Sequence, residues 1–183
     1  MSESVSALGG ASFDGFVAVR EIGPLGMISL RVKPGVAGLD RAIREVVGTG
    51  VPAQRRIEVL GDRAVAWMSP DELLLILPYR HTETAMATIG SMLAGQHHLA
   101  AVVSDARAVF RIEGAKADQV IAKLCPVDMD RLAEGEVRRT RAAQVAAAFW
   151  RQGEGVTLVC FRSVAPYVMG LLKHSAMVGS ELE

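Results

Sequence analysis

The sequence is poor in several features that mark particular classes of protein. Two cysteines are too few for the disulfide framework of a small secreted domain. No segment reaches the roughly 18 consecutive apolar residues that a membrane-spanning helix needs. Net charge is also absent, because 20 Lys and Arg balance 20 Asp and Glu, so no general positive field attracts nucleic acid or anionic lipid. Residues Met1–Gly15 carry acidic Glu3 where a signal peptide needs positive charge, so we expect a cytoplasmic protein.

Hydrophobic residues, in contrast, make up half of the chain, and 22% of the residues are charged. This composition excludes a disordered chain and leaves apolar side chains for a partner-facing surface, which would favour self-association of the isolated protein. A chain of 183 residues is long enough for one domain with a sizeable core. We expect a loose N-terminal arm over residues 1–15 and a single globular domain over residues 16–183.

Hydrophobic periodicity predicts an α+β fold in which one pattern occurs twice. The first half, about residues 16–104, is interpreted as β-α-β-β-α-β, and the second half, about residues 105–175, as β-α-β-β-α. Each half then holds a mixed or antiparallel sheet packed against helices. In detail, Thr82 and Ser163 are expected to cap helices, and residues 137–150 are expected to form one long strand.

Motifs for several kinds of active site are missing from the sequence. The best match to a dinucleotide-binding glycine motif is Gly48, Gly50 and Ala53, which follows a helix and contains a proline, and no P-loop motif exists. The four histidines lack the spacing of a catalytic zinc site. Cys125 and Cys160 are expected to be buried thiols without catalytic function.

Arginines near residue 140 form the one candidate for an anion site. On a strand, Arg139 and Arg141 share a face while Arg138 points the other way. Arg139 and Arg141 are therefore weak candidates for binding a cofactor or another anion. A solvated strand edge or an intersubunit ion pair explains the same pattern.

Five short motifs occur in an order and spacing that resemble a known family. They are Trp67–Leu75, Val103–Arg107, Lys123–Asp128, Gly135–Gln144 and Phe161–Tyr167. Together they resemble the gamma subunit of heterotetrameric sarcosine oxidase, over about Glu21 to Leu172.

The resemblance implies a place in an oxidoreductase complex of sarcosine catabolism. That complex oxidatively demethylates sarcosine to glycine and hydrogen peroxide, and it forms methylenetetrahydrofolate in one-carbon metabolism. The partners are expected to be the alpha, beta and delta subunits. These are expected to carry FAD, FMN, NAD, tetrahydrofolate and zinc, with no cofactor and no metal on this chain. The expected fold is similar to the folate-binding region of the glycine cleavage T-protein.

The resemblance also directs attention to particular residues as interface or structural residues. Of these, Trp67 is expected either to pack in the core or to anchor a partner. Arg107, Arg139, Arg141 and Arg162 are expected to hold Asp71, Asp105 and Asp128 in ion pairs. The full set of expected interface or structural residues is Trp67, Pro70, Asp71, Glu72, Ser104, Asp105, Arg107, Arg138, Arg139, Arg141, Arg162, Ser163 and Tyr167.

Two hypotheses for the function follow. The first is a noncatalytic structural or assembly subunit of heterotetrameric sarcosine oxidase, with no catalytic residue of its own. The alternative is a module that binds folate or another one-carbon carrier, with Arg139 and Arg141 holding a glutamate tail. A freestanding enzyme is disfavoured because the active-site motifs are missing.

Overall fold

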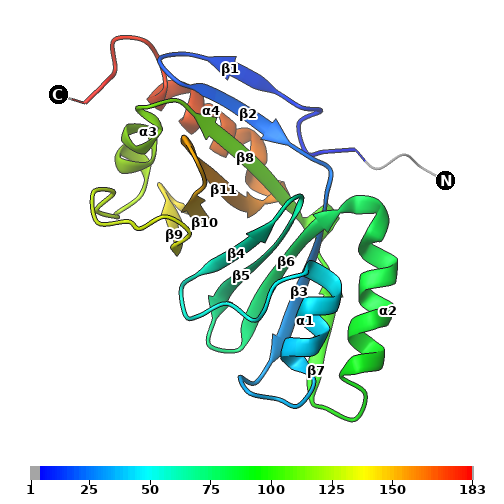
Figure 1. The fold of residues 1–183 in the computed structure, drawn as a ribbon. Coiled ribbons are helices and arrows are strands. Elements are labelled where there is room, and N and C mark those ends of the chain that lie inside the picture. Colours follow the sequence, from blue (N-terminus) through cyan, green and yellow to red (C-terminus); the bar gives the residue numbers. More distant parts are fainter. Residues whose placement is uncertain (1–4, 183) are drawn as a thin grey trace. The chain divides into compact units, whose positions relative to one another are not determined.

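The computed structural model describes residues 5–182, which fold into two compact units (Figure 1). One unit consists of residues 25–104, and the other combines residues 5–24 with residues 105–182. The first boundary thus separates Ser104 from Asp105, near the expected junction of the halves. The second boundary, after Pro24, was not anticipated, and we call the two parts the central unit and the terminal unit.

The central unit is a five-stranded antiparallel sheet with two helices on one face. Its sheet has the order β4-β5-β6-β3-β7, and α1 packs against α2. Ile28, Leu30 and Leu75 from the sheet are fully buried with Ile43 and Ile89 from the helices. The elements are β3 (Leu25–Val32), α1 (Leu39–Val47), β4 (Ile57–Leu60), β5 (Arg63–Ser69), β6 (Glu72–Pro78), α2 (Thr82–Met92) and β7 (His98–Val102).

The terminal unit repeats this architecture with one additional strand. Its antiparallel sheet has the order β1-β2-β8-β11-β10-β9, and α3 packs against α4. Phe110, Phe149 and Leu158 are fully buried with Ile121 and Leu172 of these helices. The elements are β1 (Ser12–Asp14), β2 (Ala18–Ile22), β8 (Arg107–Glu113), α3 (Ala117–Leu124), β9 (Val137–Ala142), β10 (Val145–Arg151), β11 (Gly155–Phe161) and α4 (Ala165–Ser175).

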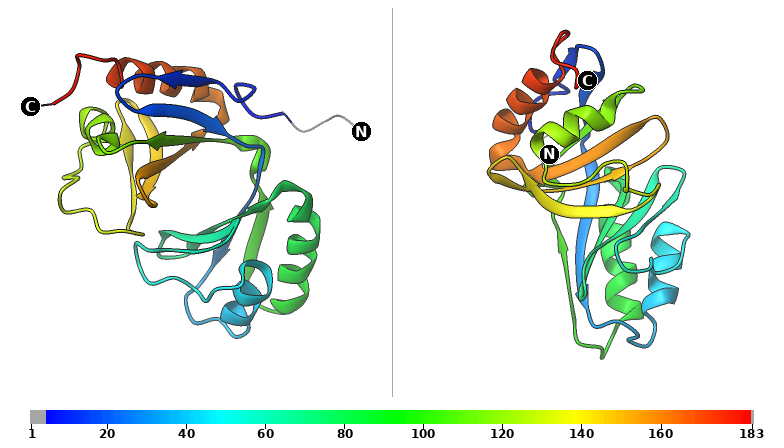
Figure 2. Two further views of the ribbon diagram at one scale, coloured as in Figure 1. Left: turned by 45° about the horizontal axis from the view of Figure 1, so that its top comes forward. Right: turned by 90° about the vertical axis from the view of Figure 1, so that its left-hand side faces the viewer.

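Apart from β1, the two sheets have the same strand order, and each includes a strand that directly precedes a unit boundary in sequence, β2 in one and β7 in the other. In sequence, β2 leads into β3 and β7 leads into β8. In space, β2 pairs with β8, and β7 pairs with β3 (Figures 1 and 2). β7 thus completes the sheet of its own unit, whereas β2, from residues before Pro24, joins a sheet whose strands β8 to β11 follow Ser104.

The predicted regions of strand and helix are largely confirmed, but three strands, β4, β5 and β6, lie between α1 and α2 where the sequence predicted two. Four further differences are local. Residues 137–150 are two strands, because the chain turns at Ala143, which has φ 50°. Neither Thr82 nor Ser163 is an N-cap, since 3-10 turns at Tyr79–His81 and Arg162–Val164 precede α2 and α4. Residues 5–15 differ from the expected loose arm, because they include β1 and pack on the core of the terminal unit.

Within residues 5–182, no helix combines the length and apolar character needed to cross a membrane.

Candidate functional site

The expected interface residues are divided between the two units. Trp67, Pro70, Asp71 and Glu72 lie at the β5–β6 turn, and Ser104 lies at the end of the central unit. The other expected residues, from Asp105 to Tyr167, belong to the terminal unit.

A hollow of about 310 Å³ opens beside the β5–β6 turn of the central unit. Its walls are mostly apolar and include Val32, Leu39 and Val51. Three prolines also line it, which makes these walls stiff because a proline ring fixes φ: Pro34, Pro52 and Pro70. Trp67 lines the hollow as well, while part of its side chain packs on the core of the unit. The structure thus shows part of the expected core packing of Trp67, and its role as an anchor for a partner stays a prediction.

Two carboxylates stand at this hollow in fixed positions. Glu72 is nearly buried and accepts hydrogen bonds from Ser29 Oγ at 3.0 Å and from Arg31 Nη2 at 3.2 Å. Asp71 accepts a hydrogen bond from Ser69 Oγ at 2.8 Å, and its carbonyl oxygen accepts one from the amide of Val32 at 2.9 Å. The side chain of Asp71 is 58% exposed, and its distance to Arg31 is 3.7 Å.

Ser104 links the end of β7 to the first residues of β3 through a hydrogen bond. Its hydroxyl is buried and accepts a hydrogen bond from the amide of Met27 at 2.9 Å. The neighbouring amide of Val103 donates to the carbonyl oxygen of Met27 at 2.8 Å. The side chain of Ser104 therefore accepts a hydrogen bond from a main-chain amide where the pairing of β3 with β7 ends.

In the terminal unit, Arg107 and Phe161 form a cross-strand pair. The two residues are register partners on β8 and β11, and the guanidinium lies 4.1 Å from the centre of the Phe161 ring. Phe161 is 48% exposed. Tyr167 on α4 is also exposed, as is Ser163 in the preceding 3-10 turn.

The two cysteines are buried, as the sequence predicts. Burial raises the pKa of the Cys125 thiol to about 11. It also raises the pKa of the Cys160 thiol to about 11, although the charge of Arg107 opposes this shift. Both thiols are protonated near neutral pH, which disfavours nucleophilic chemistry.

The arginines of β9 alternate as expected for a strand. Arg139 and Arg141 are exposed on one face, whereas Arg138 is half-buried on the other. Arg138 Nη2 pairs with Glu136 at 3.0 Å, while its Nε is buried without a hydrogen-bond partner. Because β9 is the last strand of its sheet, Arg139 and Arg141 lie at an edge.

Two of the expected aspartates, Asp71 and Asp128, lie near arginines other than those expected. Asp71 approaches Arg31, and Asp128 pairs with Arg131 at 3.2 Å within the same loop. Arg162 donates to the carbonyl oxygens of Val5 at 2.9 Å and Ser6 at 3.2 Å. These partners are close in space through turns that residue type alone does not reveal.

Sequence reasoning missed Glu21, a buried carboxylate on β2. It accepts hydrogen bonds of 2.9 Å from Ser6 Oγ and from the amides of Leu8 and Gly10. The strand Ala18–Ile22 holds two charged residues in succession, Arg20 and Glu21, and strand alternation places Glu21 on the opposite face from the exposed Arg20. Glu21 and Arg162 together hold the N-terminal segment on the terminal unit.

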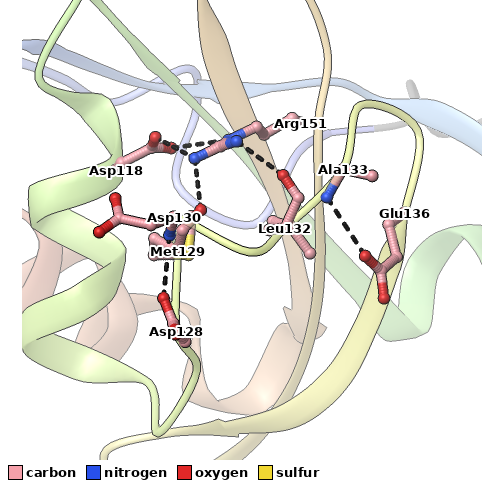
Figure 3. A network of polar contacts seen from close by, with 8 residues as sticks. All are labelled: Asp118, Asp128, Met129, Asp130, Leu132, Ala133, Glu136 and Arg151. Atoms are coloured by element: carbon pink, nitrogen blue, oxygen red, sulfur yellow. Dashed lines mark hydrogen bonds and ion pairs between the residues drawn. The ribbon is translucent and has the colours of Figure 1, made fainter.

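Arg151 is a second residue that the sequence did not single out, and it organises the loop before β9 (Figure 3). Its guanidinium pairs with Asp118 on α3 and donates to the carbonyl oxygens of Met129 and Leu132, each at 2.6 Å. One side chain thus ties a helix, a strand and a loop together. No sequence motif identifies an arginine with this role.

No group of three or more His, Cys, Asp or Glu side chains within the described residues 5–182 is arranged to hold a metal ion.

Comparisons with known proteins identify relatives in sequence. The sarcosine oxidase, gamma subunit family matches residues 33–177. Sarcosine oxidase subunit gamma from an Arthrobacter species is 33% identical over 153 residues, which cover 81% of this chain and 73% of that protein. Its counterpart from Corynebacterium sp. strain P-1 is 34% identical with the same coverage.

Solved structures give a consistent result. A chain of the heterotetrameric sarcosine oxidase from Corynebacterium sp. U-96, in complex with pyrrole 2-carboxylate, is 25% identical with a TM-score of 0.80, covering 90% of this chain and 87% of that chain. The glycine cleavage system aminomethyltransferase T from Bartonella henselae has a TM-score of 0.67 at 13% identity, over 86% of this chain and 45% of that chain. The second likeness concerns the fold alone and confirms the α+β fold expected from the sequence.

Proposed function

Since this chain belongs to the sarcosine oxidase gamma subunit family, we propose that it is a structural subunit of a heterotetrameric sarcosine oxidase. The observation that carries the proposal is the likeness of nearly the whole chain to a chain of such a heterotetramer. In this proposal the partners are the alpha, beta and delta subunits, and the complex works in the cytoplasm. The gamma chain contributes binding surface and stability to the larger subunits.

The proposed complex oxidatively demethylates sarcosine to glycine and hydrogen peroxide and passes the one-carbon unit to tetrahydrofolate. We assign the flavins, NAD, tetrahydrofolate and zinc to the other subunits. The chemistry of the charged residues supports a structural role for the gamma chain. Glu21, Arg151 and Arg162 bind main-chain groups of their own unit. The two thiols have pKa values of about 11, far from the values of catalytic cysteines.

Co-expression with the large subunits from the same source tests the proposal. The affinity tag is placed on the gamma chain, and the purified material is analysed by native mass spectrometry and by an absorbance scan. The expected result is a complex with two larger chains and a small one, with a flavin spectrum. Recovery of a colourless gamma chain alone, while the large subunits are demonstrably expressed, contradicts the proposal.

The alternative of a folate-binding module stays a prediction and has a separate test. A ligand of the native state raises the melting temperature by mass action. Titrating the isolated gamma chain with tetrahydrofolate therefore gives a thermal shift only if the chain itself binds folate. The double variant Arg139→Gln with Arg141→Gln then removes that shift if these residues hold the glutamate tail.

A further inference from the structure

We propose that the hollow at the β5–β6 turn receives an arginine side chain from a partner subunit. The proposal rests on the proposed function, because the arginine is assigned to another chain of the heterotetramer. It concerns the Trp67 hollow, defined by the residues that line it around Trp67, Val51 and Asp71.

Size and wall chemistry suit a long side chain with an apolar stem. The volume of about 310 Å³ is near the lower limit of ligand pockets in proteins. Valine, leucine and proline walls accept the methylene groups that arginine carries below its guanidinium. The indole of Trp67 offers an aromatic surface, on which a planar guanidinium stacks better than an ammonium does.

The charge of the lining residues also favours a cation as the occupant of the hollow. Its charged lining residues are Asp71 and Glu72, both acidic, and no Lys or Arg lines it. Arg31 lies beside both carboxylates and makes a hydrogen bond to Glu72. The negative charge open to an incoming partner lies on Asp71, whose side chain is 58% exposed.

Asp71 is placed to receive a second partner. It lies 3.7 Å from Arg31, a loose distance for an ion pair, and half of each side chain or more is exposed. Such pairs contribute little and are readily exchanged. Because Ser69 Oγ and the Val32 amide hold the residue at both ends, the carboxylate needs little reordering to bind an incoming guanidinium.

The hollow has the composition of an interface anchor site. Trp and Arg are enriched at the centres of protein interfaces, and charged pairs there give orientation and specificity. Prolines preorganise the walls, so the entropic cost of ordering falls mainly on the arginine. The geometry therefore points to a partner arginine whose stem fills the hollow and whose head pairs with Asp71.

The chemistry of the hollow is tested on the isolated full chain with a small probe. N-acetyl-arginine amide is titrated while the indole N–H signal of Trp67 is followed by NMR, assigned with Trp67→Phe. The matched probe is N-acetyl-citrulline amide, which has nearly the same shape and no charge. We expect saturable shifts with the arginine probe and binding at least about fivefold weaker with the citrulline probe. Equal binding of both probes, or no shift with either, overturns the proposal.

Two variants and two matched controls locate the site. Asp71→Asn should remove the preference for arginine over citrulline, and Val51→Arg should block the hollow with a side chain of the kind that the partner supplies. Asp62→Asn and Val59→Arg change exposed residues of the same kinds outside the hollow and should behave as the wild type. If the controls lose probe binding to the same extent, the assignment to this hollow is wrong.

Co-purification links the hollow to the complex. When wild-type gamma chain is recovered with the large subunits, Val51→Arg should reduce the recovered fraction at least about fivefold relative to Val59→Arg. Equal recovery of the two variants overturns the partner assignment. If the wild-type chain itself is not recovered, the proposed function fails, and the probe titration alone then decides whether the hollow takes an arginine.

Discussion

Glu21, Arg151 and Lys123 are charged side chains whose partners are mainly main-chain groups. Glu21 binds the amides of residues 8 and 10, and Arg151 binds the carbonyl oxygens of residues 129 and 132. Lys123 donates to the carbonyl oxygen of Ser175 at 2.8 Å, at the end of α4, and to that of Ser180. In this way a few charges fix segments that have no helix or sheet ladder of their own.

Replacing Glu21 with Gln should release the N-terminal segment. Gln keeps the shape, but it replaces a charged acceptor of several hydrogen bonds with a neutral amide, one end of which donates. We expect the free energy of unfolding to fall by about 1–3 kcal/mol. Hydrogen exchange should accelerate at the amides of Leu8 and Gly10.

The control for this change is Glu58→Gln, at an exposed position on β4. It should alter the free energy of unfolding by less than about 0.5 kcal/mol. Unchanged exchange at Leu8 in the Glu21→Gln variant would contradict the role of this carboxylate.

The two thiols should react slowly in the folded protein. With a pKa of about 11 in place of 9.0, Cys125 and Cys160 hold far less thiolate at pH 8. Two pKa units correspond to about a hundredfold lower reaction rate with iodoacetamide than in the unfolded chain. The rate should rise steadily between pH 8 and pH 11; a plateau near pH 9 would show that the thiols are not held in an apolar environment.

At the scale of elements, strands and helices follow hydrophobic patterning, whereas turns depend on particular backbone conformations. Leu39, Ile43 and Val46 recur at helical spacing and form α1, whose C-cap is Gly48 in the left-handed conformation. The sequence between Arg141 and Val145 contains no Gly, Asn or Pro to mark the turn between β9 and β10. A strand pair was therefore predicted as one strand.

Replacing Ala143 with Gly should stabilise the protein. Ala143 adopts φ 50°, a left-handed conformation that costs a residue with a Cβ about 1 kcal/mol, and Gly adopts it without that cost. We expect the free energy of unfolding to rise by about 1 kcal/mol in urea titrations.

Ala146→Gly is the matched control, because Ala146 is exposed on the extended strand β10. Glycine in a strand interior should lower the free energy of unfolding by about 0.5–1 kcal/mol. The same sign for both variants would contradict the assigned turn.

At the scale of the whole molecule, the pairing of β2 with β8 joins the beginning of the chain to its second half. The sheet of the terminal unit contains β1 and β2 from residues before Pro24, although all its other strands follow Ser104. Val17 and Val19 from this early segment are buried in the same core as Phe110 and Ile112. The second half of the sequence is consequently incomplete as a folding unit.

Fragment experiments should reveal this dependence. Residues 105–183 alone should show no cooperative thermal transition by circular dichroism, since β8 would lack its partner strand and the core would lose Val17 and Val19. A permuted fragment, in which a flexible linker joins residue 183 to residues 5–24, should regain cooperative melting. Equal behaviour of the two fragments would contradict a structural requirement for the early strands.

The sequence by itself determined most of the strands and helices, the α+β class and the family, because these depend on periodicity and on motifs within short segments. The burial of both cysteines was predictable from their apolar surroundings. Only the tertiary structure decided which strands pair. It also decided that Glu21 holds the N-terminal segment and that residues 32, 51 and 71 meet around Trp67. These features depend on contacts between distant parts of the chain, and local pattern does not record such contacts.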